Sequence, residues 1–184
     1  MSRSVAMKLL QLQIRNLYNR KHRVIRTPFD VFINYGGKDT RRTVASLLFD
    51  HLYRLNFRPF LDDKSMKSGD KLFDKIDNAM KGCKIGVAIF SPRCCESYFC
   101  LHELALILES KKKMIPIFLN NGRIPLEEVE KFNLALEEGK CTVGLTFDSY
   151  KENWTDVVTN AAKLVVESLI KEEQMLHHNP LIAF

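Results

Sequence analysis

One glutamate, Glu103, lies in a stretch that is otherwise apolar, among Leu101, Leu104 and Leu108. Solubility does not require a carboxylate in such surroundings. At a ligand-binding crevice, it could stabilise the positive charge that develops on a ribose carbon when a glycosidic bond breaks. The alternative is a surface glutamate that pairs with a nearby lysine. The residues of this stretch, taken alone, favour that alternative.

A second candidate is the glycine pair Gly36-Gly37, which is followed by Asp39 and Thr40. Glycine lets the backbone adopt positive φ and approach a ligand closely, and the N-terminus of a helix attracts phosphate. An ordinary turn between a strand and a helix can also contain such a glycine pair. The pair alone is therefore at least as consistent with a plain turn as with phosphate binding.

Other kinds of site lack essential residues. The segment around His102 has no second histidine for a zinc protease motif, and the chain has neither a P-loop nor a Gly-x-Gly-x-x-Gly motif. Asp62 and Asp63 are adjacent, and such pairs at a loop mouth are usually solvated, so we expect no metal. The five cysteines include the adjacent pair Cys94-Cys95, which does not fit zinc-ligand spacing. We expect reduced thiols.

The length of 184 residues and the 46% hydrophobic content predict one soluble globular domain with a real core. The net charge of +6 is unevenly distributed, because residues 1–28 hold seven Lys or Arg and no acidic residue. The rest of the chain has 21 basic residues against 22 acidic ones. A nearly neutral body argues against general nucleic-acid binding.

The basic segment 1–28 has leucines among Gln, Asn and Arg, and Pro28 marks its end. A disordered extension, an organelle-targeting peptide and an amphipathic helix at a membrane surface all remain open for it.

From Phe29 onward, short apolar runs alternate with longer stretches of helical periodicity, which predicts a parallel sheet with right-handed crossovers. The second run contains a proline, typical of an edge strand, and the third is apolar throughout, typical of a central strand. These features favour a flavodoxin-like α/β fold with strand order 2-1-3-4-5. The expected strands are 29–35, 57–61, 85–90, 114–118 and 142–147, and the expected helices are 40–55, 70–80, 97–111, 126–138 and 154–170.

In that strand order, the chain reverses direction between the first and third strands. A crevice must therefore open between the loops 35–39 and 91–97, and ligands of open parallel sheets bind at such a switch point. We expect any ligand to touch these two loops.

Five ordered segments resemble those of plant TIR domains. They cover much of residues 28–170, and the second corresponds to the BB loop of that family: Phe29–Arg41, Phe60–Lys64 with Ser68–Asp70, Ile89–Pro92, Ser97–Leu104 and Ile115–Phe118. The resemblance implies a flavodoxin-like domain over 29–171, between the basic extension and a C-terminal tail over 172–184. It is closest in type to the compact plant proteins that consist of a TIR domain alone.

The resemblance also implies an activity, the cleavage of NAD⁺, and of NADP⁺ as well, at the nicotinamide–ribose bond. The products would be nicotinamide with ADP-ribose or cyclic ADP-ribose isomers, as in an ADP-ribosyl cyclase or cyclic ADP-ribose hydrolase. NAD⁺ would be the substrate, and no cofactor is expected. Glu103 matches the catalytic glutamate of the family. The substrate pocket would contain Tyr35, Gly36, Gly37, Asp62, Lys64, Gly69, Ser97 and Phe99.

Family members associate with themselves through the BB loop and helices, and with other TIR domains. Their nucleotide products signal in plant immunity and cell death through lipase-like heterodimers. The resemblance therefore implies a cytoplasmic protein, also nuclear, with organelle targeting by residues 1–28 left open. A non-catalytic adaptor that binds other TIR domains is the alternative function.

Three positions depart from the family pattern. Gly36 replaces a common arginine, Phe99 replaces a common tryptophan, and Ser46-Leu47 replaces a Ser-His pair used in one interface. The loss of the arginine and of the tryptophan favours the adaptor, and the Ser46-Leu47 pair argues against that particular interface. The retention of Glu103 favours the enzyme. No buried partner of Glu103 can be identified from the sequence, so we expect Glu103→Ala to fold normally.

Overall fold

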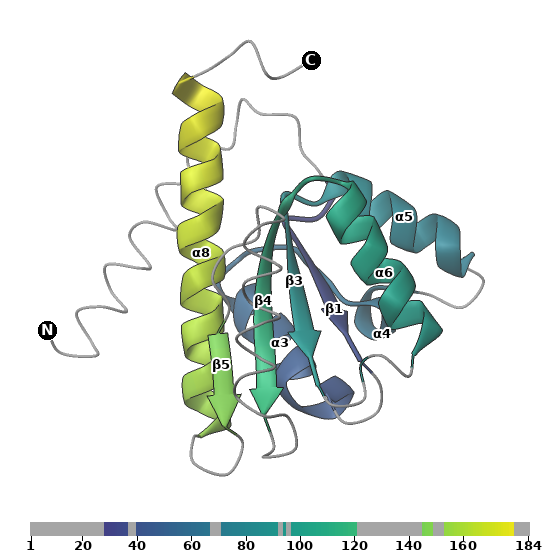
Figure 1. Cartoon of the computed structure of the whole chain (residues 1–184). Helices are drawn as coiled ribbons and strands as arrows, with labels where there is room; N and C mark the ends of the chain where they lie inside the picture. The colour runs from purple at the N-terminus through teal and green to yellow at the C-terminus, as the bar shows by residue number, and fades with distance from the viewer. Residues whose placement is uncertain are drawn as a thin grey trace, which may run out of the picture.

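The computed structural model describes residues 28–36, 40–66, 71–91, 94, 97–120, 145–148 and 153–178. A parallel sheet lies between two layers of helices, with α8 and α3 on one side and α5 and α6 on the other (Figure 1). The basic segment 1–27 and the expected helix over 126–138 lie outside the described residues.

The sheet has five parallel strands in the order β2-β1-β3-β4-β5, which confirms the predicted topology. The edge strand contains Pro59, which pairs with Val31 of the next strand. Every residue of the third strand is buried, as its apolar sequence predicts. The strands are β1 (Val31–Tyr35), β2 (Pro59–Phe60), β3 (Ile85–Phe90), β4 (Lys113–Asn120) and β5 (Leu145–Asp148).

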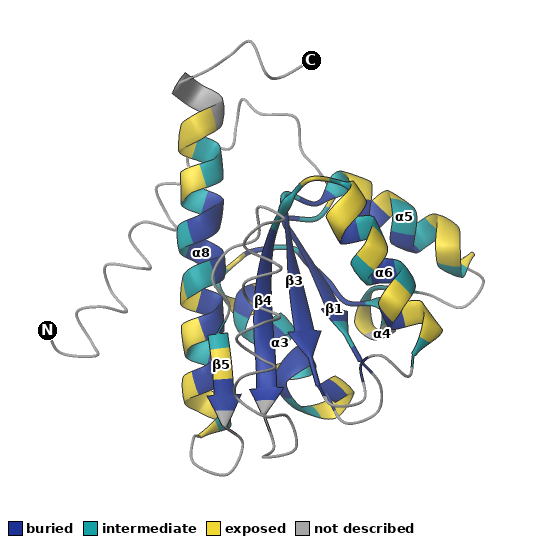
Figure 2. Ribbon diagram, viewed as in Figure 1, coloured by how far each residue is buried: buried dark blue, intermediate teal, exposed yellow. Residues whose placement is uncertain are grey.

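Alternation along the strands divides the core in two. Val31 and Ile33 pack in the cluster beneath α3 and α8, whereas Phe32 packs in the cluster beneath α5 and α6. Figure 2 shows β1, β3 and β4 mostly buried, β5 partly exposed, and the outer faces of these helices exposed. The helices are η2 (Arg41–Ala45), a π-helical turn, followed by α3 (Ser46–Arg54), α4 (Asp62–Ser65), α5 (Leu72–Gly82), α6 (Tyr98–Glu109) and α8 (Trp154–His178).

Two elements differ from the prediction. A helical turn, α4, forms at the start of the predicted BB loop, because the side chain of Ser65 accepts a hydrogen bond from the Leu61 amide at 3.0 Å. The last helix continues beyond residue 171 to His178, so it takes in the first part of the predicted tail. No helix of the described ranges is long and apolar enough to cross a lipid bilayer.

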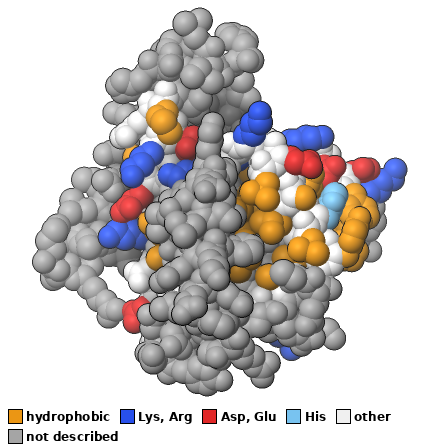
Figure 3. Space-filling model, in the orientation of Figure 1, with side chains coloured by type: hydrophobic (Ala, Val, Ile, Leu, Met, Phe, Trp, Pro, Cys, Tyr) orange, Lys and Arg blue, Asp and Glu red, His pale blue; other side chains and the backbone are white. Residues whose placement is uncertain are grey.

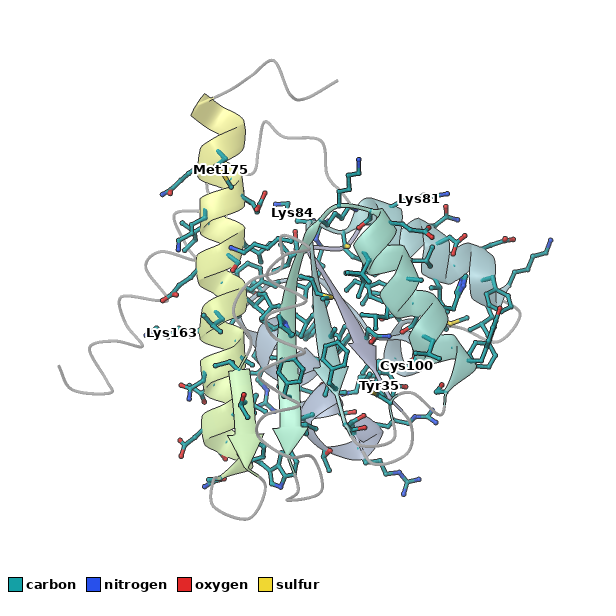
Figure 4. All side chains as sticks on the ribbon, in the orientation of Figure 1. Tyr35, Lys81, Lys84, Cys100, Lys163 and Met175 are labelled. Atoms are coloured by element: carbon teal, nitrogen blue, oxygen red, sulfur yellow. The ribbon has the colours of Figure 1, made fainter. Side chains whose placement is uncertain are left out.

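A charge network at the amino ends of the strands holds the extended part of α8. Asp30 is buried and accepts two hydrogen bonds from the guanidinium of Arg58, at 3.1 and 3.0 Å. Lys84 lies 3.8 Å from Asp30 and donates at 2.6 Å to Glu173 of α8. Figure 4 shows Lys84 at this end of the sheet and Tyr35 at the opposite end. The network therefore lies at the opposite end of the sheet from the carboxyl ends of the strands, where Tyr35 is found.

Candidate active site

A pocket of about 340 Å³ opens where β1 ends, between α4, α5 and α6. It contains Tyr35 and Ser97, which border the two loops predicted to surround the crevice. Figure 4 shows Tyr35 and Cys100 together at this end of the sheet. The pocket-lining residues are Tyr35, Arg41, Asp62, Leu72, Ile76, Ser97, Phe99, Cys100 and Glu103.

Glu103 lies on the inner face of α6, between Cys100 and Ile107, and is only 4% exposed. The alternative of a surface glutamate paired with a lysine is therefore wrong. Its Oε2 accepts a 2.9 Å hydrogen bond from the side-chain amide of Asn34 in β1. This hydrogen bond also makes the expectation that Glu103 has no buried partner wrong. Asn34 lies between Ile33 and Tyr35 in β1, and nothing in the sequence shows that its side chain reaches α6.

Small residues in β3 bring α6 close to the sheet. A Cβ atom at Gly86 would lie 2.9 Å from the side chain of Ile107, so the helix lies against bare backbone there. Ala88 is the register partner of Asn34 in β1. The close approach of α6 is what lets the short side chain of Asn34 span the distance from the strand to the helix.

The environment of Glu103 raises the pKa of its carboxyl from 4.5 to about 8. Burial is the largest cause, because the charged form loses its hydration, and the negative charge of Asp62 acts in the same direction. The hydrogen bond from Asn34 opposes both by stabilising the carboxylate. The raised pKa therefore favours the protonated form of the carboxyl near neutral pH.

Tyr35 joins the end of β1 to α4. Its hydroxyl donates a 2.7 Å hydrogen bond to Asp62. Burial, and then this bond, raise the pKa of Tyr35 far above neutrality, so the phenol stays protonated. The pair holds α4 at the rim of the pocket.

Lys64 does not lie in the pocket, contrary to the sequence-based prediction. Its ammonium donates to Asp50 of α3 at 2.7 Å and lies 4.9 Å from the centre of the Phe49 ring. Asp62 faces Tyr35 on one side of α4, whereas Lys64 faces α3 on the other. The ion pair of Lys64 with Asp50 attaches α4 to α3. Its role in this structure is to anchor the rim.

Gly36 is packed against the loop that follows β3. A Cβ atom at this position would collide with the Cα and Cβ atoms of Cys94, and the Gly36 carbonyl accepts a 3.0 Å hydrogen bond from the hydroxyl of Thr40. An arginine side chain has no room there. A different arginine, Arg41, lines the pocket instead.

Ser97 and Phe99 lie where α6 begins. The hydroxyl of Ser97 caps the helix by accepting a 3.3 Å hydrogen bond from the Cys100 amide. Phe99 is 47% exposed at the pocket and stacks on Phe73 of α5, with 5.8 Å between ring centres. The phenyl ring thus supplies an aromatic surface at the mouth.

Five of the predicted site residues come together in the pocket, namely Tyr35, Asp62, Ser97, Phe99 and Glu103. Gly37 and Gly69 lie outside the described residues. The prediction missed Asn34 and Arg41. A polar residue inside the apolar run Phe32–Tyr35 was a usable signal for Asn34, whereas Arg41 carried none beyond its charge. In the described ranges, no three His, Cys, Asp or Glu side chains are grouped as metal ligands.

Comparison with known proteins places this arrangement in a family. The sequence pattern of the TIR domain matches residues 28–178. The chain is 40% identical over 168 residues to "Probable 2' cyclic ADP-D-ribose synthase BdTIR" of Brachypodium distachyon, covering 84% of this chain and 75% of that protein. It is 30% identical over 136 residues to "Disease resistance protein RPV1" of Vitis rotundifolia, covering 72% of this chain and 9% of that protein. The chain therefore corresponds to a small part of such resistance proteins.

Two solved structures have the same fold. The TIR domains of the activated Roq1 resistosome match with a TM-score of 0.60 and 23% identity, over 74% of this chain and 99% of that one. A chain of the RPS4 and RRS1 TIR domain heterodimer matches with a TM-score of 0.55 and 16% identity, over 77% of this chain and 98% of that one.

Proposed function

The chain belongs to the TIR domain family, and from this we propose that it cleaves NAD⁺ between nicotinamide and ribose, with Glu103 as the catalytic residue. One observation carries the proposal: the carboxyl of Glu103 is buried and lines the pocket. The resemblance to the family assigns the catalytic glutamate to this residue. The 40% identity to a plant protein named as a probable cyclic ADP-ribose synthase supports it.

The proposed reaction breaks the bond between C1′ of the ribose and the pyridinium nitrogen. The electron pair leaves with nicotinamide, which departs as a neutral molecule, and positive charge develops on the ribose. The carboxylate of Glu103, in a site of low dielectric constant, stabilises that charge. Because the nicotinamide ring is itself a cation, bound substrate favours the ionised form of Glu103, and the carboxyl proton is released on binding.

The acceptor of the ribosyl cation decides the product. Water gives ADP-ribose and one proton, whereas a hydroxyl of the same nucleotide gives a cyclic ADP-ribose and one proton. The name of the Brachypodium relative supports the cyclic product for this chain. NADP⁺ has the same scissile bond and belongs to the same proposal.

The remaining pocket residues match the parts of a dinucleotide. The guanidinium of Arg41 can bind a phosphate oxygen, which is the task that Gly36 cannot perform. Phe99, stacked on Phe73, offers a ring face on which a base can stack. Both residues would orient the nicotinamide ribose toward Glu103.

We also propose that the domain acts as an assembly with other copies or other TIR domains. Its exposed apolar side chains support this, since Tyr98, Leu101 and Leu108 of α6 are all at least 44% exposed. Figure 3 shows hydrophobic side chains gathered over α6 and α5 on the face in view. Signalling to lipase-like heterodimers by the nucleotide product, and a cytoplasmic and nuclear location, are parts of the same proposal.

The test is nicotinamide release from NAD⁺ by purified protein, both in solution and crowded on a surface. We expect release by the wild type and loss of release in Glu103→Gln, while Glu109→Gln, an exposed change on the same helix, retains it. Chromatography of the other product separates hydrolysis from cyclisation. If crowded wild-type protein releases no nicotinamide, the enzyme is rejected in favour of the adaptor.

A further inference from the structure

We infer, resting on the proposed function, that Asn34 is the positioning residue of Glu103: its amide occupies Oε2 and so leaves Oε1 as the oxygen that meets the ribose. Within the described part of the chain, Asn34 is the one hydrogen-bond donor to Glu103. Glu103 lines the pocket and Asn34 occupies one of its two carboxyl oxygens, so we assign the other oxygen to the ligand.

The orientation of the Asn34 amide is unambiguous. Its nitrogen donates one hydrogen bond to the backbone carbonyl of Cys100 at 3.0 Å and the other to Glu103 at 2.9 Å. A backbone carbonyl can only accept, so the nitrogen must face α6. The amide oxygen lies 3.6 Å from the sulfur of Cys100, which can donate to it. Rotation of the amide would break all three contacts.

The side chain of Asn34 is itself held in place by its position in the sheet. Its side chain comes from the central part of the sheet, is 1% exposed, and lies on the face that α6 covers. Glu103 is attached to that rigid strand at one oxygen. A catalytic group held by a buried neighbour loses little entropy when the substrate arrives.

Asn34 is also the contact that favours the charged form of Glu103. Burial raises the pKa of this carboxyl most, and the negative charge of Asp62 of α4 raises it further. The phenol of Tyr35 and the guanidinium of Arg41 also line the pocket, and His102 precedes Glu103 on α6. A hydrogen bond donated to a carboxylate stabilises its charged form, and for Glu103 the Asn34 amide supplies that bond.

Two variants test this role. Asn34→Leu keeps the approximate volume and removes every polar contact, and Asn34→Ser keeps a hydroxyl but removes both N–H groups. In each, we expect the pH profile of NAD⁺ cleavage to shift upward by about one pH unit, since the carboxylate loses a hydrogen bond. Activity near neutral pH should then fall about tenfold and recover toward the wild type at higher pH.

Purely structural damage predicts a different result, namely a loss of activity that is the same at every pH. That outcome would overturn the inference. Ser168→Ala, another buried polar position, on α8, is the matched control and should leave the profile unchanged. Circular dichroism and thermal unfolding establish that each variant is folded.

A second measurement does not depend on catalysis. The carboxyl carbon of Glu103, labelled with ¹³C and assigned with Glu103→Gln, can be titrated by NMR in the absence of NAD⁺. We expect a higher pKa in Asn34→Ser than in the wild type. An unchanged pKa overturns the role of Asn34, whereas a raised pKa in a protein that releases no nicotinamide rejects the proposed function alone.

Discussion

The hydroxyl of Tyr35 donates a 2.7 Å hydrogen bond to Asp62, and this bond joins the end of β1 to the helical turn α4 at the rim of the pocket. Tyr35→Phe removes this bond to the Asp62 carboxylate. We expect a loss of about 1 kcal/mol in the free energy of unfolding. KM for NAD⁺ should rise while kcat changes little, because the phenol, with its raised pKa, takes no part in proton transfer.

The matched control for this variant is Tyr53→Phe, at an exposed position of α3. Denaturant unfolding and steady-state kinetics measure both effects. A fall in kcat alone in Tyr35→Phe would show that Tyr35 acts on the reacting bond.

Gly36→Ala tests whether the missing arginine of the family pattern could be restored. The added Cβ would collide with the backbone of Cys94, and backbone cannot turn aside as a flexible side chain can. Overpacking of this kind costs about 1–3 kcal/mol. We expect a lower midpoint of denaturant unfolding in Gly36→Ala and a larger drop in Gly36→Arg. A fully stable Gly36→Arg would show that the loop after β3 moves freely.

Glu103→Gln should increase stability, and the increase should depend on pH. The pKa of Glu103 is raised by folding, so between about 4.5 and 8 the folded state binds more protons than the unfolded state. Stability contributed by this group is therefore lost as pH rises through that window. The neutral amide of the glutamine avoids this cost, which reaches about 5 kcal/mol above pH 8.

Thermal unfolding of wild type and Glu103→Gln from pH 5 to pH 9 measures this difference. The two curves should be similar at the acid end and diverge toward the alkaline end. Curves that stay parallel would mean that the carboxyl is ionised in the folded protein throughout.

The pH dependence of catalysis should also report the ionisation of Glu103. If the carboxylate is the active form, kcat/KM for NAD⁺ rises with pH through about 8, the pKa of Glu103 in the free protein. Asp62→Asn removes a negative charge that raises this pKa, so its profile should shift to lower pH. A profile that falls over the same range would assign Glu103 the role of a proton donor instead.

Lys64→Met should leave NAD⁺ cleavage near the wild-type rate, because the ammonium is paired with Asp50 rather than with the pocket. The loss of a surface ion pair costs no more than about 1 kcal/mol. A large rise in KM in this variant would show that Lys64 turns toward the substrate when the domain assembles.

The fold could be predicted because short sequence patterns indicate each strand and its place in the sheet. Pro59 marks the edge strand, and the buried run Ile85–Phe90 marks the central one. Glu103 stood out by contrast with its apolar neighbours. Asn34 stood out in the same way, but its pairing with Glu103 could not be predicted, since the contact joins residues 69 positions apart and depends on how closely α6 approaches Gly86.

The error at Lys64 has a related cause. A lysine beside two aspartates in a loop that borders a crevice is a reasonable phosphate ligand until the direction of its side chain is known. That direction follows from the turn α4, which the short segment Asp62–Ser65 forms only with the support of its own Ser65 and of Phe49 and Asp50 in α3. Tertiary contacts of this kind leave no periodic signal in the sequence.

The burial of Glu103 bears on how the site distinguishes the oxidised from the reduced form of the dinucleotide. On the proposed function, the carboxyl of Glu103 ionises more readily when a cation binds beside it, and the nicotinamide ring is charged in the oxidised dinucleotide and neutral in the reduced one. NADH therefore gains nothing from the ionisation of Glu103. The site would respond to the concentration of NAD⁺ rather than to that of NAD⁺ and NADH together.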